Sequence, residues 1–339
     1  MYARSISLLI LAILVVSSGS SAQQPSTKDT SSDKKVQVPS HSTAAPTEPK
    51  ENWAAFDDLK TGLHPMTVDV VQHAETADFV REMVRVEWRL GDPIDLWIMR
   101  PKSAGKVPVV LYLYSYIGES DRFRNDGWGK RATADGFAAV GFVSAFANER
   151  FRMRPMKQWF ISELPEAIGS TVHDVQLILD YLATRGDMDM DRVGMFGMGS
   201  GATIAILAAH ADPRIKTLDV LDPWGDWPDW LESSPVVLDS ERAQYTSQQF
   251  LKSARTFDPL AYLPTLKTSN LRLQQTLSDV TTPTKAKERL AAAVPTQDQV
   301  VKYENDEALF KAWKTSGLSG WIKQQMRSQK PEAVAMSGP

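Results

Sequence analysis

The chain contains no cysteine and has no strong excess of charge of either sign. Without cysteine, a disulfide framework, a thiolate metal site and a lipid-modified cysteine anchor are all excluded. The formal net charge is -3 and both signs are mixed along the chain, so we expect no nucleic-acid partner. Stability must come from an apolar core, and 339 residues with 42% hydrophobic content suffice for one large domain.

Long apolar runs are also missing, apart from one near the N-terminus. That run extends from Leu8 to Val16, follows Arg4, and is succeeded by small residues ending at Ala22. This three-part layout is typical of a signal peptide, and the run is shorter than the roughly 20 residues that span a bilayer. We therefore predict a signal peptide over residues 1–22, cleaved after Ala22. The product is expected to be secreted or periplasmic, with no membrane partner after cleavage.

Large apolar residues are scarce at both ends of the remaining chain. Residues 23–50 consist mainly of Ser, Thr, Pro, Gln, Lys and Asp, a composition that cannot bury enough surface to offset the entropy of ordering. We interpret residues 23–50 as a disordered linker and residues 51–327 as the folded domain. Residues 328–339 are expected to form a flexible tail.

Strand-like and helix-like segments alternate within the domain. Phe79–Leu90 and Pro93–Met99, joined by a Gly-Asp turn, predict a hairpin, and the apolar run Val107–Tyr114 is typical of a strand buried on both faces. Further strands are expected at Ala138–Ala145, Arg192–Met198, Ile215–Leu221, Leu271–Leu277 and Val300–Tyr303, and helices at Thr171–Thr184, Gly201–Ala211, Lys285–Ala293 and Ala308–Trp313. This alternation predicts an α/β fold whose doubly wound, mostly parallel sheet carries helices on both faces.

Glycine is concentrated in the turn after the strand Arg192–Met198. The segment Gly197–Gly201 reads Gly-Met-Gly-Ser-Gly and resembles the G-x-S-x-G nucleophile elbow of α/β-hydrolases, in which a strained turn lifts a serine above the sheet. The outer glycines are in place, but Gly199 stands where the resemblance implies the nucleophile. Glycine tolerates the strained backbone of that position at little cost once catalysis is not required.

Ser200 is the alternative nucleophile. In this register it is the first residue of the helix, where its backbone N–H is expected to serve the oxyanion hole and its side chain to point elsewhere. Centring the motif on Ser200 instead places Met198 and Ala202 where small flanking residues are needed. In relatives the loop after the strand Val107–Tyr114 gives a second oxyanion donor, so we expect it at Tyr116 or Ile117.

The resemblance also implies where the rest of a catalytic triad should lie, since the order in this family is nucleophile, acid, histidine. The strand, loop and helix around Asp279 are similar to those of dienelactone-hydrolase-like and acetyl-xylan-esterase-like members, and Asp279 matches the acid. Alternatively, Asp279 is a turn residue that caps the next helix.

Histidine is scarce and misplaced for a triad. After the last predicted strand, where relatives carry a histidine, the chain has Glu304–Glu307. His173 lies in the helix before the elbow strand, where it either reaches the pocket or is a hydrogen-bonded structural residue. The five histidines all precede the acid: His41, His64, His73, His173 and His210.

Tryptophan and aspartate, by contrast, are concentrated in the segment Asp222–Trp230. At the carboxyl edge of the sheet, exposed indoles beside carboxylates suit a sugar or a cation, which makes Trp224, Trp227 and Asp222 ligand-binding candidates. The alternative is a lid whose tryptophans pack onto the domain. Three aspartates at loose spacing do not define a coordination shell, so we predict no metal site and no cofactor.

The missing nucleophile serine and the missing triad histidine predict a protein that resembles serine carboxylesterases but no longer hydrolyses. With the predicted signal peptide, we expect an exported protein on the α/β-hydrolase fold. A general base must lie within hydrogen-bond reach of the nucleophile, and both groups are missing. We expect either a small-molecule ligand such as an ester, a carboxylate or a sugar, or a structural role. The alternative is an active carboxylic-ester hydrolase, similar to dienelactone hydrolase or acetyl esterase, that uses Ser200.

Overall fold

The computed structural model describes residues 51–56, 67–102, 105–114, 121–146, 150, 161–317 and 319–328. The predicted signal peptide, the whole predicted linker, the predicted tail after residue 328 and both Tyr116 and Ile117 lie outside these residues. From Asn52 onward the described residues belong to one compact unit. Among the helices described there, none is long and apolar enough to cross a membrane.

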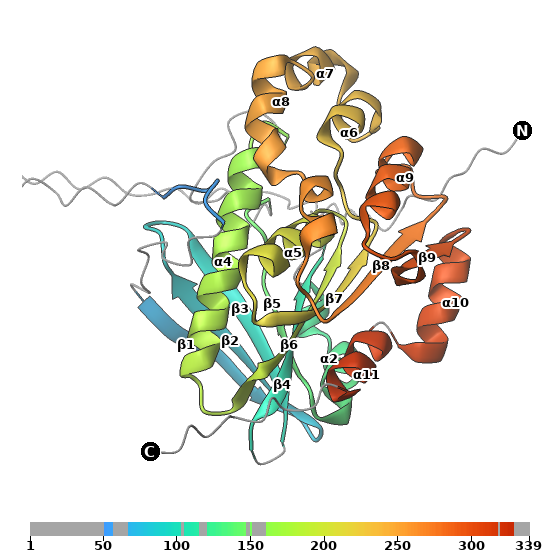
Figure 1. Ribbon diagram of the computed structural model, residues 1–339. Coiled ribbons are helices and arrows are strands. Elements are labelled where there is room, and N and C mark those ends of the chain that lie inside the picture. The colour runs from blue at the N-terminus through green and yellow to red at the C-terminus, as the bar shows by residue number, and fades with distance from the viewer. Residues whose placement is uncertain are drawn as a thin grey trace, which may run out of the picture. The chain divides into compact units, whose positions relative to one another are not determined.

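In the described residues, nine strands form one mixed sheet in the order β1-β2-β3-β5-β4-β6-β7-β8-β9 (Figure 1). The pairs that join β1, β2, β3 and β5 are antiparallel, and all pairs from β5 through β4 to β9 are parallel. The strands are β1 (Thr67–Glu75), β2 (Phe79–Glu87), β3 (Pro93–Pro101), β4 (Val107–Leu113), β5 (Ala138–Gly141), β6 (Met188–Met198), β7 (Ile215–Leu221), β8 (Asn270–Thr276) and β9 (Val300–Tyr303).

Helices cover both faces of this sheet. On one face, α4 and α5 pack onto the apolar side chains of the central strands, and on the other face α2 and α11 pack around Tyr112 and Phe196. The α-helices are α1 (Asp121–Arg124), α2 (Asp126–Thr133), α4 (Leu164–Thr184), α5 (Ser200–Ala211), α6 (Trp227–Ser233), α7 (Asp239–Tyr245), α8 (Gln248–Ala254), α9 (Thr284–Ala293), α10 (Asp306–Ser316) and α11 (Gly320–Ser328). The predicted α/β architecture is therefore confirmed.

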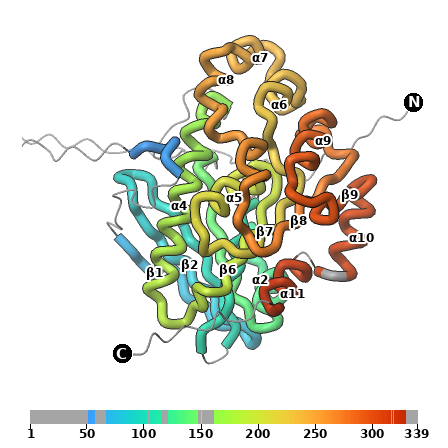
Figure 2. The backbone as a smooth tube through the Cα atoms, viewed as in Figure 1, coloured from blue at the N-terminus to red at the C-terminus, as the bar shows by residue number. Residues whose placement is uncertain are grey.

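Figure 2 shows that α6, α7 and α8 form a group of short helices at the top of the view, between α4 and α9. Short 3₁₀ turns connect this group to β8 and recur near β5 and β9. They are η1 (Ala134–Gly136), η2 (Arg255–Phe257), η3 (Pro259–Ala261), η4 (Leu263–Thr265) and η5 (Gln297–Gln299).

Several elements differ from the prediction. β5 ends at Gly141 rather than at Ala145, and β6 begins at Met188 rather than at Arg192. The sequence reading began the sheet at Phe79 and placed His73 before the first strand, whereas His73 lies within β1. A bulge between Val70 and Gln72 breaks the two-residue period of β1, and every residue but one of the strand is exposed, so no burial pattern marks it. Helix α4 begins at Leu164 rather than at Thr171, because its first turns contain proline, glycine and serine and lack a helical signature.

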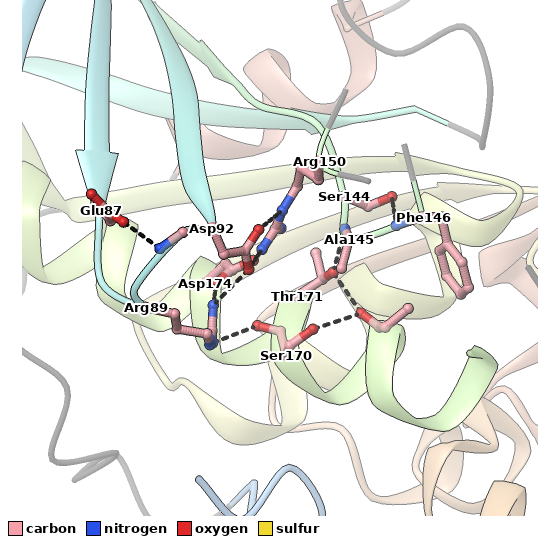
Figure 3. A network of polar contacts seen from close by, with 12 residues as sticks. Glu87, Arg89, Asp92, Ser144, Ala145, Phe146, Arg150, Ser170, Thr171 and Asp174 are labelled. Carbon is pink, nitrogen blue, oxygen red and sulfur yellow. Dashed lines mark hydrogen bonds and ion pairs between the residues drawn. The ribbon is translucent and has the colours of Figure 1, made fainter. Parts of the chain in front are cut away.

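A buried ion network ties the β2–β3 turn to α4 (Figure 3). The Arg150 guanidinium donates to both carboxylate oxygens of Asp92, at 2.9 and 2.5 Å, and to Oδ2 of Asp174 at 2.7 Å. Arg89 also donates to Asp174 and to the carbonyl of Ser170. Two guanidinium groups thus balance two carboxylates, which satisfies the condition for burying charge. The network fixes α4, which packs against the helix that follows the elbow.

Candidate functional site

The turn between β6 and α5 has the strained geometry expected of a nucleophile elbow. Gly199 at its centre has φ 56° and ψ -122°, a conformation that is costly for any residue but glycine. Its N–H donates to the carbonyl of Leu221 on β7 at 2.9 Å. Its own carbonyl accepts from the N–H groups of Ala202 and Thr203, at 3.0 and 3.2 Å. The elbow therefore keeps its shape with a hydrogen atom where a catalytic side chain would stand.

The two outer glycines are required by close backbone approaches. A Cβ atom on Gly197 would lie 2.5 Å from the carbonyl oxygen of Gly201. A Cβ atom on Gly201 would overlap the carbonyl oxygen of Leu113 on β4. Both obstacles are backbone atoms, which cannot move aside as a flexible side chain can. The glycine spacing read from the sequence thus reflects the packing of the elbow, with Gly199 in the central position.

Ser200 is the first residue of α5, and only 2% of its surface is exposed. The sequence assigned it this place at the start of the helix. A serine so enclosed presents little surface to an incoming ester, although its backbone belongs to the positive end of α5.

The carboxyl ends of β6 to β9 form one continuous edge, here called the carboxyl edge, because these strands are parallel neighbours. Beyond the elbow, the N–H of Asp222 donates to the carbonyl of Gln274 at 2.9 Å, and Oδ1 of Asp222 accepts from the N–H of Thr276 at 2.7 Å. The N–H of Leu277 in turn donates to the carbonyl of Tyr303 at 2.8 Å. Hydrogen bonds therefore link the elbow, the β7 end, the β8 end and the β9 end.

Asp279 lies in the loop of residues 277–283, here called the acid loop, and is held within it. Its carboxylate oxygens accept from the N–H groups of Thr281 at 3.1 Å and Thr282 at 3.2 Å. The ammonium of Lys287 lies 3.7 Å from Oδ2 of Asp279 and donates to the carbonyls of Thr276 and Asp279, at 2.6 and 2.5 Å. The carboxylate of Asp279 thus orders its own turn, which agrees with the turn part of the alternative interpretation. It does not cap the next helix, because α9 begins after Pro283 without a side-chain cap.

Asp222 differs from Asp279 in its electrostatics. Burial, and after it the charge of Asp279, raise the pKa of Asp222 to about 7, although the hydrogen bond from Thr276 and the charge of Lys287 act in the opposite direction. Its backbone is also left-handed, with φ 47°. The pKa of Asp222 therefore lies in the neutral range, well above that of an ordinary aspartate.

Lys287 is the residue of this edge that the sequence reading missed. It lies on α9, where lysine is an ordinary exposed residue, yet only 4% of its surface is exposed. Leu290 and Ala291, three and four residues further along, are apolar and buried on the same face of the helix. That spacing is the sequence signal that could have placed Lys287 inward.

No histidine follows β9 in the sequence, and Asn305 there caps α10 by accepting from the N–H of Ala308 at 3.0 Å. His173 is buried, with Nε2 at 3.2 Å from the carbonyl of Ala55, which is the structural role that the sequence reading gave as the alternative to a pocket residue. Of the other described histidines, His73 approaches two glutamates in the β1–β2 region, and the ring of His210 packs against Tyr262 at an interplanar angle of 52°. His41 and His64 lie outside the described residues.

The tryptophans of the segment Asp222–Trp230 are buried, so they do not form the exposed stacking surface considered from the sequence. Trp224 is 5% exposed and Trp227 1%, and both rings pack against Trp230, with centroids 5.0 and 5.6 Å apart. The hydroxyl of Thr203 on α5 donates to the carbonyl of Trp224 at 2.5 Å. This arrangement agrees with the lid interpretation. Within the described ranges, no three histidine, aspartate or glutamate side chains are grouped to hold a metal ion.

Comparison with solved structures supports the fold. The chain is similar to an acetyl xylan esterase from Paenibacillus sp. R4, with 19% identity and a TM-score of 0.59 over 78% of this chain and 92% of that one. It is also similar to acetyl xylan esterase 1 from Thermoanaerobacterium sp. JW/SL YS485, with 14% identity and a TM-score of 0.61 over 75% of this chain and 86% of that one. At these identities the likeness concerns the fold, which is the α/β-hydrolase fold.

Sequence comparison places the chain in a family. It is 23% identical over 169 residues to the protein YtaP of Bacillus subtilis (strain 168), which carries a hydrolase name; the match covers 45% of this chain and 56% of YtaP, so the chain spans about half of that relative. The family of X-Pro dipeptidyl-peptidases (S15 family) matches residues 91–331, which include the elbow, the carboxyl edge and α11. The chain therefore belongs to the X-Pro dipeptidyl-peptidase (S15) family of the α/β-hydrolase superfamily.

Proposed function

We propose that this protein is an exported α/β-hydrolase relative that does not hydrolyse through a serine nucleophile, and that its carboxyl edge instead binds a small ligand. The observation that carries the proposal is Gly199 at the centre of a fully formed elbow. A serine-dependent hydrolase needs an oxygen at that position and a base within hydrogen-bond reach. Here the first is missing from the elbow and the second from the loop after β9.

The absence of these groups is expected to cost most of the catalytic rate. In a serine triad, removal of either the serine or the histidine costs about a million-fold in rate, and the residual acceleration comes from binding and the oxyanion hole. The groups that support binding are retained, because the outer glycines and the positive end of α5 are in place. A ligand with a carbonyl or carboxylate oxygen suits that helix end best. The burial of Trp224 and Trp227 gives less support to a sugar.

A covalent labelling experiment separates this proposal from an active esterase that uses Ser200. The protein cleaved after Ala22 is incubated with a fluorophosphonate probe and with a short activated ester, in parallel with the matched variant Ser200→Ala. We expect no adduct, and turnover that does not differ between the two proteins, because the Ser200 side chain is enclosed. A probe adduct on Ser200 together with turnover lost in Ser200→Ala would overturn the proposal.

Ligand binding is tested separately by thermal denaturation with short esters, short carboxylates and oligosaccharides. A ligand that binds only the folded state raises the melting temperature as its concentration increases. We expect a rise with esters or carboxylates, reduced in Gly199→Val, whose side chain projects from the elbow into the site. An absence of any rise across the panel counts against the ligand-binding part of the proposal and favours a structural role.

A further inference from the structure

Tyr114, which directly follows β4, lies beside the elbow. A Cβ atom on Gly201 would lie 2.8 Å from the carbonyl oxygen of Tyr114, so the backbone of Tyr114 adjoins the start of α5. The Tyr114 ring packs on Phe196 of β6 and on Phe123 of α1, with its centroid 6.0 Å from each. Tyr114 therefore connects the elbow to α1.

Helix α1 is anchored by Phe123. This side chain is fully buried, and its ring fills the space over Gly141 of β5, where a Cβ atom would lie 2.0 Å from it. Only glycine leaves room for the ring at that position. Arg122 and Arg124 flank Phe123 in the chain, so the anchored ring fixes the part of the surface that both guanidinium groups can reach.

Aromatic rings, rather than carboxylates, position these two arginines. The guanidinium carbon of Arg122 lies 4.4 Å from the centroid of the Tyr114 ring, and that of Arg124 lies 5.6 Å from the centroid of the Trp97 ring. Most of the other described arginines pair with a carboxylate, whereas neither Arg122 nor Arg124 does so within the described part of the chain. A guanidinium held by a ring face keeps its full charge and its N–H edge for an anion.

The hydroxyl of Tyr114 is a second donor that lacks an acceptor. Tyr114 is 1% exposed, and its hydroxyl makes no hydrogen bond of ordinary geometry with the described residues. Burial raises the pKa of Tyr114 to about 12 against the opposing charge of Arg122, so the hydroxyl keeps its proton. Arg122 and Trp128, which both act on this hydroxyl, carry N–H donors and no acceptor. A buried hydroxyl without an acceptor is unfavourable, and a bound ligand oxygen would remove that penalty.

We propose that Arg122 and the Tyr114 hydroxyl form an anion subsite beside the elbow, which binds the carboxylate group of a small ligand. A carboxylate has two planar oxygens, so it can accept from the N–H edge of Arg122 and from the Tyr114 hydroxyl together. Asp222 and Asp279 lie on the other side of the elbow, after β7 and β8, so an anionic group is favoured on the β4 side. The subsite rests on the proposed function, because it names the chemical class of ligand that the carboxyl edge binds.

A charged probe and its neutral counterpart test the subsite. The protein cleaved after Ala22 is titrated with hexanoate and with hexanamide, which is nearly the same in shape but uncharged, and dissociation constants are measured by calorimetry. We expect hexanoate to bind about tenfold or more tightly than hexanamide, because only the carboxylate makes charge-assisted hydrogen bonds with Arg122. Added salt should weaken the binding of hexanoate and leave that of hexanamide unchanged.

Three variants locate the binding. Arg122→Gln is expected to raise the dissociation constant of hexanoate about tenfold and to leave that of hexanamide unchanged. Tyr114→Phe keeps the ring beneath the guanidinium and removes the hydroxyl, so we expect a several-fold weaker binding of hexanoate. Arg124→Gln is the matched control, because it removes the same charge from α1 but lies over Trp97 of β3, farther from the elbow. Its effect is expected to stay within about twofold.

Three outcomes overturn the subsite. They are equal binding of hexanoate by Arg122→Gln and the unaltered protein, equal binding by Tyr114→Phe and the unaltered protein, and an equal loss in Arg122→Gln and Arg124→Gln, which would indicate a general effect of net charge. Failure of the subsite is distinguishable from failure of the proposed function. If neutral esters bind and hexanoate does not, the proposed function stands and the subsite is refuted. If no ester and no carboxylate binds, the ligand-binding part of the proposed function fails as well.

Discussion

Two clusters of buried charge in this protein contrast with each other. In the network of Arg89, Asp92, Arg150 and Asp174, two guanidinium groups meet two carboxylates. At the carboxyl edge, among the described residues, the ammonium of Lys287 lies 3.7 Å from Asp279, and burial together with the charge of Asp279 raises the pKa of Asp222 to about 7. The balanced cluster joins the β2–β3 turn to α4, whereas the unbalanced one lies at the ends of β7 and β8 beside the elbow. Unbalanced charge destabilises the fold, and its position at a strand edge where ligands bind is typical of a functional site.

The largest effect is expected when the balanced network is broken. Arg150→Leu leaves Asp92 and Asp174 buried with one guanidinium between them, and removal of one partner from a buried ion network costs about 3–5 kcal/mol. The free energy of unfolding is measured by urea denaturation. The matched control is Arg85→Leu, because the Arg85–Asp95 pair lies on the exposed surface of the same hairpin, with 47% and 30% of the side chains accessible. That pair is expected to contribute less than about 1 kcal/mol, and equal effects of the two variants would contradict the contrast.

Removal of a charge from the cluster of Asp222, Asp279 and Lys287 should instead raise the free energy of unfolding. Asp222→Asn is expected to stabilise the protein at pH 8 and to leave it nearly unchanged at pH 4. The pKa of Asp222 is raised from 3.8 to about 7 on folding, so the stability of the native protein is highest below the lower value and is lost as pH rises through the higher one. Each pKa unit corresponds to about 1.4 kcal/mol, which gives a gain of up to about 4 kcal/mol. Thermal melts of the native protein and of Asp222→Asn from pH 4 to pH 8 test this prediction. A difference in melting temperature that stays the same across this pH range would contradict it.

The elbow allows a steric test of the same edge. Gly201→Ala places a Cβ atom against the backbone of Leu113 and Tyr114, so we expect a loss of about 1–3 kcal/mol in the free energy of unfolding. Gly186→Ala is the matched control, because nothing lies within 4 Å of its Cβ position. If both variants unfold at the same urea concentration, the close approach of β4 to the elbow is not the reason for the glycine.

The sequence predicted the features that depend on a few neighbouring residues and missed those that depend on tertiary packing. The limits of β7 and β9 were predicted correctly from short apolar runs. The position of the elbow was predicted from the spacing of its glycines. Both signals lie within a few residues of the chain. The strand β1 was missed because its bulge and exposure remove the periodic signal. Tryptophans in a loop at a ligand-binding edge suggested a stacking surface, whereas their burial depends on how α6 packs on the domain.

The charge imbalance at the carboxyl edge could not be predicted, for a related reason. Asp279 was a candidate because of the family resemblance and Asp222 because of the tryptophan- and aspartate-rich segment, but the pKa of a carboxyl depends on burial and on neighbours distant in sequence. Lys287 contacts the acid loop only because α9 folds back beneath it. The sequence thus indicated where a candidate site lies, and only the fold shows which of its carboxyls has a raised pKa.

The smallest effect is expected from restoring the missing hydroxyl. Gly199→Ser puts a side chain on a backbone with φ 56°, at a cost of about 1–3 kcal/mol, and gives no base to activate the new oxygen. Adding Glu304→His supplies a histidine after β9, but the carboxylate that should orient it is already bound by Thr281, Thr282 and Lys287. We therefore expect hydrolysis of a short activated ester by both variants to equal that of the unaltered protein. The opposite outcome is that the double variant hydrolyses the ester and that adding Asp279→Asn abolishes this activity. Asp279 would then still be available as a catalytic acid, and only two substitutions would separate this edge from a working triad.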